Sequence, residues 1–343
     1  MSYEVALSSA FLSALTMPII LNFAHKNRLY DSLDARKNHN GNIPRLGGVG
    51  IFVAFATMMF GLILIQPGTV AKELASRAGQ LWPLALSGMI MHIIGLFDDI
   101  KAQSPKLKLA IQIVAAIMVV VSGYRFRGFG FRQDAMQGQL AWFSVILSVG
   151  WIVGVTNAVN FIDGIDGLAG SVSFIIAIVY GIFYYRVEDP SSSLICLSIA
   201  GVIVGFLLFN FPMPNAKIFM GDSGSLFLGF SLAVMPFLGQ VPREESVKLS
   251  MGLFPSITML ALPVFDALRV MGLRIAEGRN PMSPDRQHVH HLFFDSGYSK
   301  LRIDLILSLV TIGLAFVVLI AADMPQSLGF MFEFIAMGLL MIF

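Results

Sequence analysis

Long apolar runs separated by short polar segments recur along the whole chain. A membrane-spanning helix needs roughly 20 apolar residues, and eleven runs of about this length are present: 4–24, 48–66, 81–97, 107–122, 140–159, 170–186, 193–210, 225–239, 249–267, 303–322 and 327–343. Only about 120 positions remain for loops and tails. We therefore predict one all-α polytopic membrane domain over residues 1–343, with its chemistry in short loops at the membrane surface.

The composition excludes the other broad classes. Of 343 residues, 56% are hydrophobic and 13% are charged, and the mean hydropathy is +0.77, whereas a soluble domain carries about 25% charged residues. The net charge of +2 gives no reason to expect a nucleic-acid partner. The single cysteine, Cys196, excludes a disulfide framework. Glu4 and the lack of a basic leader favour a retained first helix over a cleaved signal peptide.

The distribution of Lys and Arg predicts an orientation. The loops 25–47, 98–108, 211–224 and 269–302 carry 15 basic residues, against 8 in the opposite loops. Because basic loops stay in the cytoplasm, we expect the N-terminus outside and the C-terminus inside. The outer segment YRFRGFGFR, residues 124–132, departs from this bias, and its alternating pattern predicts a small external hairpin.

Polar residues of the types used in catalysis and ligand binding are concentrated on the predicted cytoplasmic side, whereas the predicted outer loops hold scattered charges. A transporter needs polar groups near the membrane midplane, and its nearest candidates, Asp266 and Asp304, fall near helix ends. A structural scaffold leaves the polar array without a purpose. The distribution favours an enzyme that joins a cytosolic reactant to a lipid.

Two motifs are rich in carboxylates. Asp98 and Asp99 end a predicted helix in GLFDDIKAQSPKLKLA, where the helix dipole and their mutual repulsion are unfavourable. They indicate a compensating cation or substrate, unless they form a solvated helix end. Ala102 excludes a DDxxD diphosphate motif.

The second such motif, NAVNFIDGIDGLAG, spaces four oxygen-bearing side chains three residues apart. They are Asn157, Asn160, Asp163 and Asp166. On a helix the first three share one face. Oxygen ligands of this kind suit Mg²⁺ or Mn²⁺ rather than zinc. Ordinary helix capping explains one or two of the four residues.

In AKIFMGDSGSLFLGF, Lys217 and Asp222 precede an apolar helix that we expect to begin near Ser225. Ser223 or Ser225 is then its capping residue, and the free N–H groups of its first turn suit a phosphate. Asp222 is placed to hold a metal that bridges the same phosphate. An ordinary capped helix start is the alternative.

Two further motifs are basic. NPMSPDRQHVHHLF contains Arg286, His288, His290 and His291, which suit a diphosphate, a zinc ion or a structural role. DARKNHNGNIPRLGGVGIF contains Arg36, Lys37, His39 and Arg45 before Gly47 and Gly48. This segment is either a plain cytoplasmic loop or a site for an anionic head group or nucleotide.

Five segments in order resemble the polyprenyl-phosphate N-acetylhexosamine-1-phosphate transferases. They are RKNHNGNIPRLGG, GLFDDIKAQSPKLKLAIQ, NAVNFIDGIDGLAG, KIFMGDSGSLFLGF and PDRQHVHHLF, and the similarity spans residues 25–300. The histidine motif resembles the bacterial branch that uses undecaprenyl phosphate and UDP-GlcNAc more than the branch that uses UDP-MurNAc-pentapeptide.

The resemblance implies transfer of an N-acetylhexosamine 1-phosphate from a UDP-N-acetylhexosamine to undecaprenyl phosphate, with release of UMP. UDP-GlcNAc is the expected donor, and GalNAc, fucosamine or quinovosamine derivatives are alternatives. The enzyme is expected in the bacterial inner membrane, at the first membrane step of a cell-surface polysaccharide pathway. A homodimer is compatible with this assignment.

The resemblance also implies residue roles. Asn160 and Asp222 are the expected ligands of Mg²⁺, with Mn²⁺ as the alternative, and Asp98 with Asp99 handles the lipid phosphate. Asp166 contacts uridine, whereas Lys108, Arg286 and His288 contact the diphosphate. The other expected substrate-binding residues are Arg45, Asn157, Asp163, Lys217, His290 and His291. Direct attack by the lipid phosphate is expected, and a covalent phosphosugar on an aspartate is the alternative.

Overall fold

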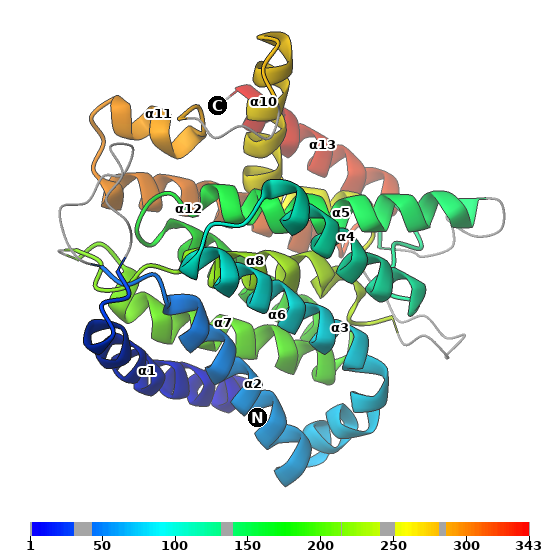
Figure 1. Cartoon of the computed structure of the whole chain (residues 1–343). Helices are drawn as coiled ribbons and strands as arrows, with labels where there is room; N and C mark the ends of the chain where they lie inside the picture. The colour runs from blue at the N-terminus through cyan, green and yellow to red at the C-terminus, as the bar shows by residue number, and fades with distance from the viewer. Residues whose placement is uncertain are drawn as a thin grey trace.

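The computed structural model describes residues 2–30, 43–131, 140–213, 215–240, 251–280 and 286–342. Within these ranges the chain forms α-helices and one short 3-10 helix, without a β-strand. In chain order they are α1 (Ser2–Lys26), α2 (Gly47–Ile65), α3 (Thr69–Ile100), α4 (Pro105–Val121), α5 (Ala141–Ile162), α6 (Leu168–Arg186), α7 (Pro190–Asn210), α8 (Gly221–Val234), η2 (Met235–Phe237), α9 (Leu253–Met259), α10 (Ala261–Ala276), α11 (Val289–Asp295), α12 (Lys300–Ala321) and α13 (Gln326–Ile342). Figure 1 shows their arrangement.

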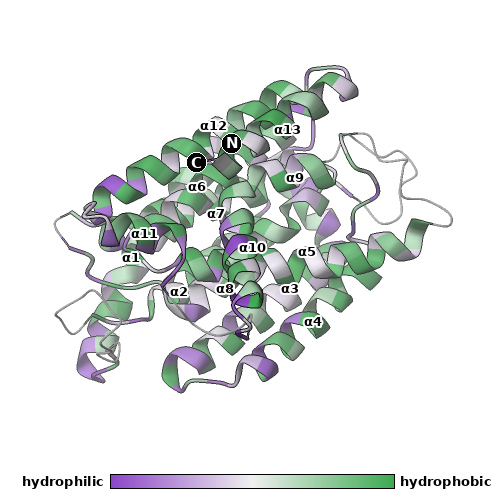
Figure 2. Cartoon of the chain, turned by 90° about the horizontal axis from the view of Figure 1, so that it is seen from above, coloured by the Kyte–Doolittle hydropathy of each residue, from purple (hydrophilic) through white to green (hydrophobic). Residues whose placement is uncertain are grey.

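The outward faces of the helices are apolar, as a membrane requires. On α1, large side chains recur every four residues and are 51–68% exposed: Tyr3, Leu7, Phe11, Leu15, Ile19 and Phe23. Residues four apart share one helix face, and a soluble protein rarely exposes so large an apolar patch. Figure 2 shows that the helices are largely hydrophobic along their lengths. The predicted class, an all-α polytopic membrane protein, is confirmed.

Each of the eleven predicted runs overlaps a helix of the structure. Seven helices are long and apolar enough to cross a membrane, and α9 with α10 forms an eighth candidate. Three others are shorter: α4 and α13 have 17 residues each and α8 has 14. The number of spans and the orientation of the chain therefore remain predictions.

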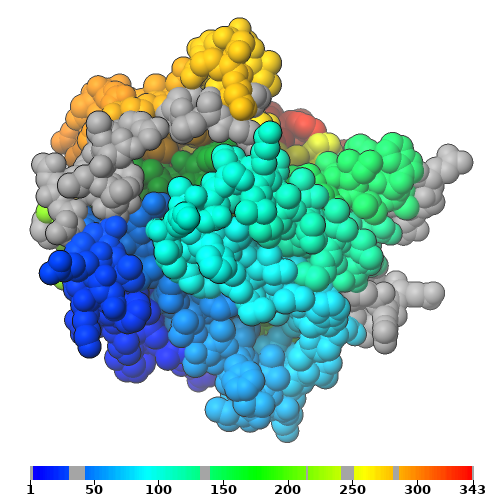
Figure 3. Space-filling view, in the orientation of Figure 1, coloured from blue at the N-terminus to red at the C-terminus, as the bar shows by residue number. Residues whose placement is uncertain are grey.

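The expectation of one continuous helix over 249–267 is wrong. α9 ends at Met259, α10 begins at Ala261, and the two helices are bent by 85°. Pro263 has no N–H to donate to the carbonyl of Met259, so a straight helix would lack a hydrogen bond here. α10 then runs on to Ala276 and stands out from the surface (Figure 3).

Helix α8 lies at the centre of the bundle, and its residues from Leu226 to Phe230 are buried. Its first turn is in backbone contact with α2 and α3. A Cβ atom on Gly48 would lie 2.1 Å from the backbone nitrogen of Gly224, and one on Gly95 would lie 2.3 Å from the carbonyl oxygen of Asp222. These two glycines therefore allow three helices to meet closely beside Asp222.

The segment predicted to be an external hairpin packs differently in its described part, up to residue 131. Its backbone does not pair with itself; instead Gly252 and Phe254 donate hydrogen bonds to the carbonyls of Gly130 and Phe129, at 2.8 Å each. Phe126 is fully buried. The segment is held by α9 rather than standing free, and Arg132 lies outside the described residues.

Candidate active site

Asp98 lies at the end of α3, next to the turn that leads into α4. Its Oδ1 accepts a hydrogen bond from the backbone N–H of Gln103 at 2.6 Å. Its Oδ2 lies 2.9 Å from Nζ of Lys108, on the first turns of α4. Ser104 caps α4 by accepting from the N–H of Leu107 at 3.2 Å. The cap and the turn together fix Lys108 beside Asp98.

Asp99, the neighbouring carboxylate, faces the start of α8 instead. Its Oδ1 accepts from the backbone N–H of Asp222 at 2.8 Å, and its Oδ2 from that of Ser223 at 2.9 Å. The helix begins at Gly221, so the expectation of a start near Ser225 with a serine cap is wrong. Asp99 occupies two N–H groups of this first turn, and the predicted use of the first turn for a phosphate remains a prediction.

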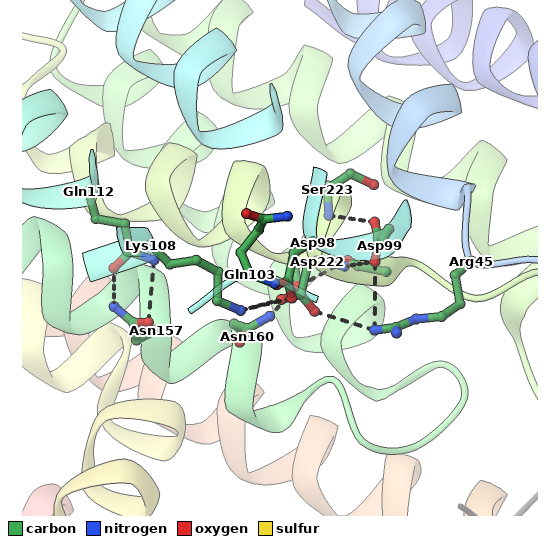
Figure 4. Close-up of polar contacts among 12 residues, drawn as sticks. Arg45, Asp98, Asp99, Gln103, Lys108, Gln112, Asn157, Asn160, Asp222 and Ser223 are labelled. Carbon is green, nitrogen blue, oxygen red and sulfur yellow. Dashed lines mark hydrogen bonds and ion pairs between the residues drawn. The ribbon is translucent and has the colours of Figure 1, made fainter. Parts of the chain in front are cut away.

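Asp222 sits between two basic side chains (Figure 4). Its Oδ2 lies 2.9 Å from Nζ of Lys108, and its Oδ1 lies 3.4 Å from Nη2 of Arg45. The same Nη2 atom lies 3.6 Å from Oδ1 of Asp99. Lys108 therefore joins Asp98 to Asp222, and Arg45 joins Asp222 to Asp99. The segment before α2, the adjoining ends of α3 and α4, and the start of α8 contribute to this cluster.

The asparagines of α5 lie along the side of the cluster. Asn160 donates its amide N–H to the hydroxyl of Ser225 at 2.8 Å, which leaves its carbonyl oxygen as the atom suited to a metal. Asn157 donates to Gln112 of α4 at 2.6 Å and to the carbonyl of Val153 at 2.8 Å. Asn157 thus ties α4 to α5, and its predicted contact with substrate remains a prediction.

Asp163 and Asp166 lie in the turn after α5. Burial raises the pKa of Asp163 well above its usual value, and the charges of Asp222 and Asp99 add to this effect, while Arg45 opposes it. Asp166 forms an ion pair with Lys300 at 2.8 Å. Lys300 was not predicted, because it is 134 residues away in the sequence.

The histidines form a second group beside this turn. Oδ2 of the buried Asp266 lies 2.7 Å from Nδ1 of His288, and its Oδ1 accepts from the N–H of Val289 at 2.9 Å. The ring of His290 fills the space over Gly164, where a Cβ would lie 2.2 Å from Nε2. Burial, with a smaller effect from His291, lowers the pKa of His290 to about 3. His290 is therefore neutral near pH 7.

Asp266 holds His288 in one orientation, with Nδ1 on the carboxylate and Nε2 left for another partner. We did not predict Asp266 as a site residue. It precedes His288 by 22 residues and belongs to a different helix. No local spacing marks such a pair.

Lys217 and Arg286 are among the predicted site residues that no hydrogen bond or ion pair within the described ranges joins to the carboxylate cluster. Lys217 is exposed. Arg286 lies 2.8 Å from Oδ1 of Asp295, on α11. Their predicted contacts with substrate remain predictions.

The donors in the cluster fit a hard divalent cation. Within the described residues, three carboxylates, those of Asp98, Asp99 and Asp222, share two basic groups, Arg45 and Lys108. The Lys108 ammonium lies 2.9 Å from two of these carboxylates, so a cation is already accommodated between them. No three His, Cys, Asp or Glu side chains of the described residues form a complete cage. Mg²⁺ commonly binds one or two carboxylates together with substrate phosphates, which agrees with this open arrangement.

Residues 81–240 match the sequence profile of glycosyl transferase family 4. A probable undecaprenyl-phosphate N-acetylglucosaminyl 1-phosphate transferase of Bacillus subtilis (strain 168) is 34% identical over 304 residues, which cover 86% of this chain and 78% of the relative. The undecaprenyl-phosphate alpha-N-acetylglucosaminyl 1-phosphate transferase of Yersinia pestis is 28% identical over 93% of this chain and 83% of its own length. The corresponding protein of Escherichia coli (strain K12) is 28% identical over 81% and 72%. The matched segment contains the whole cluster except Arg45.

Proposed function

This chain belongs to glycosyl transferase family 4, and we propose that it transfers N-acetylglucosamine 1-phosphate from UDP-N-acetylglucosamine to undecaprenyl phosphate. The relatives that cover most of the chain carry this activity in their names, and the chain is accordingly a phosphotransferase. The observation that carries the proposal is the cluster of carboxylates around Lys108 and Arg45 at one end of an apolar helix bundle (Figure 4). It offers charged groups to two phosphates where a lipid can reach them.

The reaction exchanges one bond to phosphorus. An oxygen of the lipid phosphate bonds to the phosphorus that carries the sugar, and the bond from that phosphorus to the oxygen of the departing UMP breaks. Because two anions must meet, neutralising and positioning them provides most of the catalysis. A phosphate monoester has a second pKa of about 6, so at pH 7 it is already a nucleophile and needs no strong base.

Each residue of the cluster has a defined task in this scheme. Lys108, held between Asp98 and Asp222, places positive charge between the acceptor phosphate and the donor diphosphate. Asp98 orients the acceptor or takes up its residual proton. Asp222 and Asn160 would hold Mg²⁺, or Mn²⁺ in its place, which supplies Lewis-acid neutralisation of the diphosphate. His288, oriented by Asp266, would donate Nε2–H to a diphosphate oxygen in its protonated form, because Nδ1–H is already directed at the carboxylate.

Direct attack is distinguished from a covalent route by a trapping experiment. The purified enzyme is incubated with donor labelled in the sugar phosphate, without lipid acceptor, and is then denatured and separated from free label. We expect no label on the protein. Label that remains covalently attached at an aspartate would show a phosphosugar intermediate and contradict direct attack.

The donor sugar is tested with a panel. Purified enzyme and undecaprenyl phosphate are incubated with UDP-GlcNAc, UDP-GalNAc or UDP-MurNAc-pentapeptide, and both UMP and the lipid-linked sugar are measured. We expect UDP-GlcNAc to react at least about tenfold faster than UDP-GalNAc, and the pentapeptide donor to be inert. Faster turnover of UDP-GalNAc would reassign the sugar, and no UMP with any donor would refute the proposed activity.

We further propose that the cluster faces the cytoplasm of a bacterial cell. Cys196 is buried, so single introduced cysteines report accessibility. Lys217→Cys lies at the end of the bundle that carries the cluster, and Arg186→Cys, half-exposed, lies at the opposite end. In intact cells a membrane-impermeant maleimide is expected to label Arg186→Cys alone, and to label Lys217→Cys only after permeabilisation. The reverse pattern would invert the orientation.

A further inference from the structure

We propose that Asp99 is a positioning residue that holds Asp222 in place, and that Asp98 alone of the adjacent pair meets the lipid phosphate. The proposal rests on the proposed function. It gives Asp98 and Asp99 different tasks, whereas the sequence resemblance implies that both handle the lipid phosphate. The Asp99 side chain is only 2% exposed, whereas that of Asp98 is 16% exposed beside the open turn before α4. An incoming phosphate therefore reaches Asp98 first.

Both oxygens of Asp99 are already bound by α8. They accept the backbone N–H groups of Asp222 and Ser223 at 2.8 and 2.9 Å. A carboxylate is favourable at a helix N-terminus, because the helix dipole is positive there. The space in front of Asp99 is also closed, since a Cβ on Gly221 would lie 2.6 Å from its Oδ2. The Asp99 carboxylate is therefore less accessible to a second anion than that of Asp98.

The contact made by Asp99 acts directly on Asp222. One of its two donors is the N–H of Asp222 itself, so the bond fixes the backbone of the residue whose carboxylate faces Lys108 and Arg45. On the other side of the same turn, Gly48 donates to the carbonyl of Met220 at 2.8 Å. Without Asp99, two N–H groups of this turn would lose their partners, which is unfavourable in a buried setting. The turn would then hold Asp222 less firmly.

Metal affinity separates this role from direct contact with the lipid. Purified wild type, Asp99→Asn and Asp98→Asn are titrated with Mn²⁺ alone and followed by electron paramagnetic resonance. Loss of a group that orients a metal ligand lowers metal affinity about 10- to 100-fold. We expect Asp99→Asn to bind Mn²⁺ at least about tenfold more weakly, and Asp98→Asn to stay within about threefold of wild type.

Steady-state kinetics supply the second readout. Asp99→Asn is expected to lower kcat while the KM for undecaprenyl phosphate stays within about twofold. Asp98→Asn is expected to raise this KM or to lower kcat at saturating Mn²⁺. If Asp99→Asn binds Mn²⁺ as wild type does and instead raises the KM for the lipid, Asp99 contacts the lipid and the proposal is wrong.

Gly221→Ala tests the same contact without changing a charge. Gly221 has φ +72°, and a Cβ there would meet Asp99 and the carbonyl oxygen of Arg45 at 2.5 Å. The substitution is expected to separate Asp99 from α8 and to weaken Mn²⁺ binding as Asp99→Asn does. Thermal unfolding of each variant separates this effect from misfolding, and unaltered Mn²⁺ binding by a folded Gly221→Ala would contradict the proposal.

The Mn²⁺ titration needs neither the sugar-nucleotide donor nor the lipid acceptor. A wild type that binds Mn²⁺ but releases no UMP would refute the proposed function and leave the comparison of Asp99 with Asp98 intact. A wild type that turns over without measurable Mn²⁺ binding would overturn the positioning role and leave the transferase activity standing.

Discussion

The two ends of the helix bundle differ in how their buried charges are balanced. At the end opposite the cluster, Arg77 forms a 2.8 Å ion pair with Asp189 and donates to the carbonyl of Leu238 at 2.7 Å. The second oxygen of Asp189 accepts from the hydroxyl of Ser192 at 2.7 Å. One basic group thus meets one carboxylate, and both are bound further. At the other end, three carboxylates of the described residues share two basic groups.

This difference separates a structural ion pair from a site. A balanced pair such as Arg77 with Asp189 joins α3 to the start of α7, and its two opposite charges meet within the protein. A surplus of carboxylates is unfavourable in the absence of another cation, and it is retained where that cation or a substrate contributes to function. Charge balance, more than polarity, therefore distinguishes the end that carries the candidate site.

The largest effect is expected at Asp222, which contacts both basic groups of the cluster. Asp222→Asn removes one negative charge from the cluster, while the backbone hydrogen bonds to Asp99 remain. We expect kcat to fall about 10³-fold, as for removal of a major group that stabilises charge in a transition state. UMP release from the purified protein measures this.

The matched control for Asp222 is Asp323→Asn. Asp323 is 77% exposed and forms a pair with Arg186 at 3.5 Å, and such exposed pairs contribute little. Its activity is expected to equal that of the wild type. Equal activity of Asp222→Asn and Asp323→Asn would remove the functional distinction between the two ends.

The next effect is expected at Lys108, the cation that bridges two carboxylates. Lys108→Gln increases the surplus of negative charge, so kcat should fall about 10²-fold while Mn²⁺ binds more tightly than to wild type. The two opposite changes are measured by UMP release and by paramagnetic resonance. Lys106→Gln, an exposed neighbour two residues earlier, should change neither quantity, and weaker Mn²⁺ binding by Lys108→Gln would contradict the charge-balance argument.

Much of the fold was predictable from the sequence, because in lipid every backbone polar group must be satisfied within a helix. Long apolar runs therefore mark helices. They do not mark helix ends that depend on packing. α3 begins at Thr69 rather than near residue 81, since Ala71 and Leu74 are buried against α1, α2 and α7. The charges of its first turns hide this extension in the hydropathy pattern.

The candidate site was predictable as a set of residues but not as a network. The structure brings Asp98, Asp99, Asn160 and Asp222 to one end of the bundle. The sequence could not show that Asp99 caps α8, because the two partners lie 123 residues apart. The ion pair between Lys300 and Asp166 could not be predicted for the same reason, because 134 residues separate the two in the sequence. For the bend before α10 the sequence did contain a local signal, because Pro263 interrupts an apolar run there.

A third prediction concerns the balanced end, where stability rather than activity should change. Arg77→Met leaves Asp189 buried without its cation, and breaking a buried pair from one side costs about 3 kcal/mol. We expect a lower unfolding temperature in detergent, with kcat and KM unchanged well below that temperature. Arg186→Met, in the exposed pair with Asp323, is the control and should leave the unfolding temperature unchanged. A loss of activity in folded Arg77→Met would assign a function to this end as well.

The smallest effect is expected at His290, which adds no charge to the site end near pH 7. Burial, reinforced by His291, lowers the pKa of this ring to about 3, whereas in an unfolded chain it is about 6.5. Below pH 6.5 the unfolded chain therefore binds a proton that the folded chain does not. The resulting stability is complete above pH 6.5 and is lost as the pH falls.

Between pH 7.5 and 5.5 this loss of folding stability amounts to about 1.4 kcal/mol, because pH 5.5 lies about one unit below the pKa of about 6.5 that the histidine has in the unfolded chain. Unfolding of wild type and His290→Gln at the two pH values measures it. The variant should lose less stability on acidification by this amount, and His25→Gln, an exposed histidine, should behave as wild type. Equal acid sensitivity of wild type and His290→Gln would mean that the ring is charged when folded. The surplus of carboxylates would then be smaller than the geometry indicates, and the contrast between the two ends would weaken.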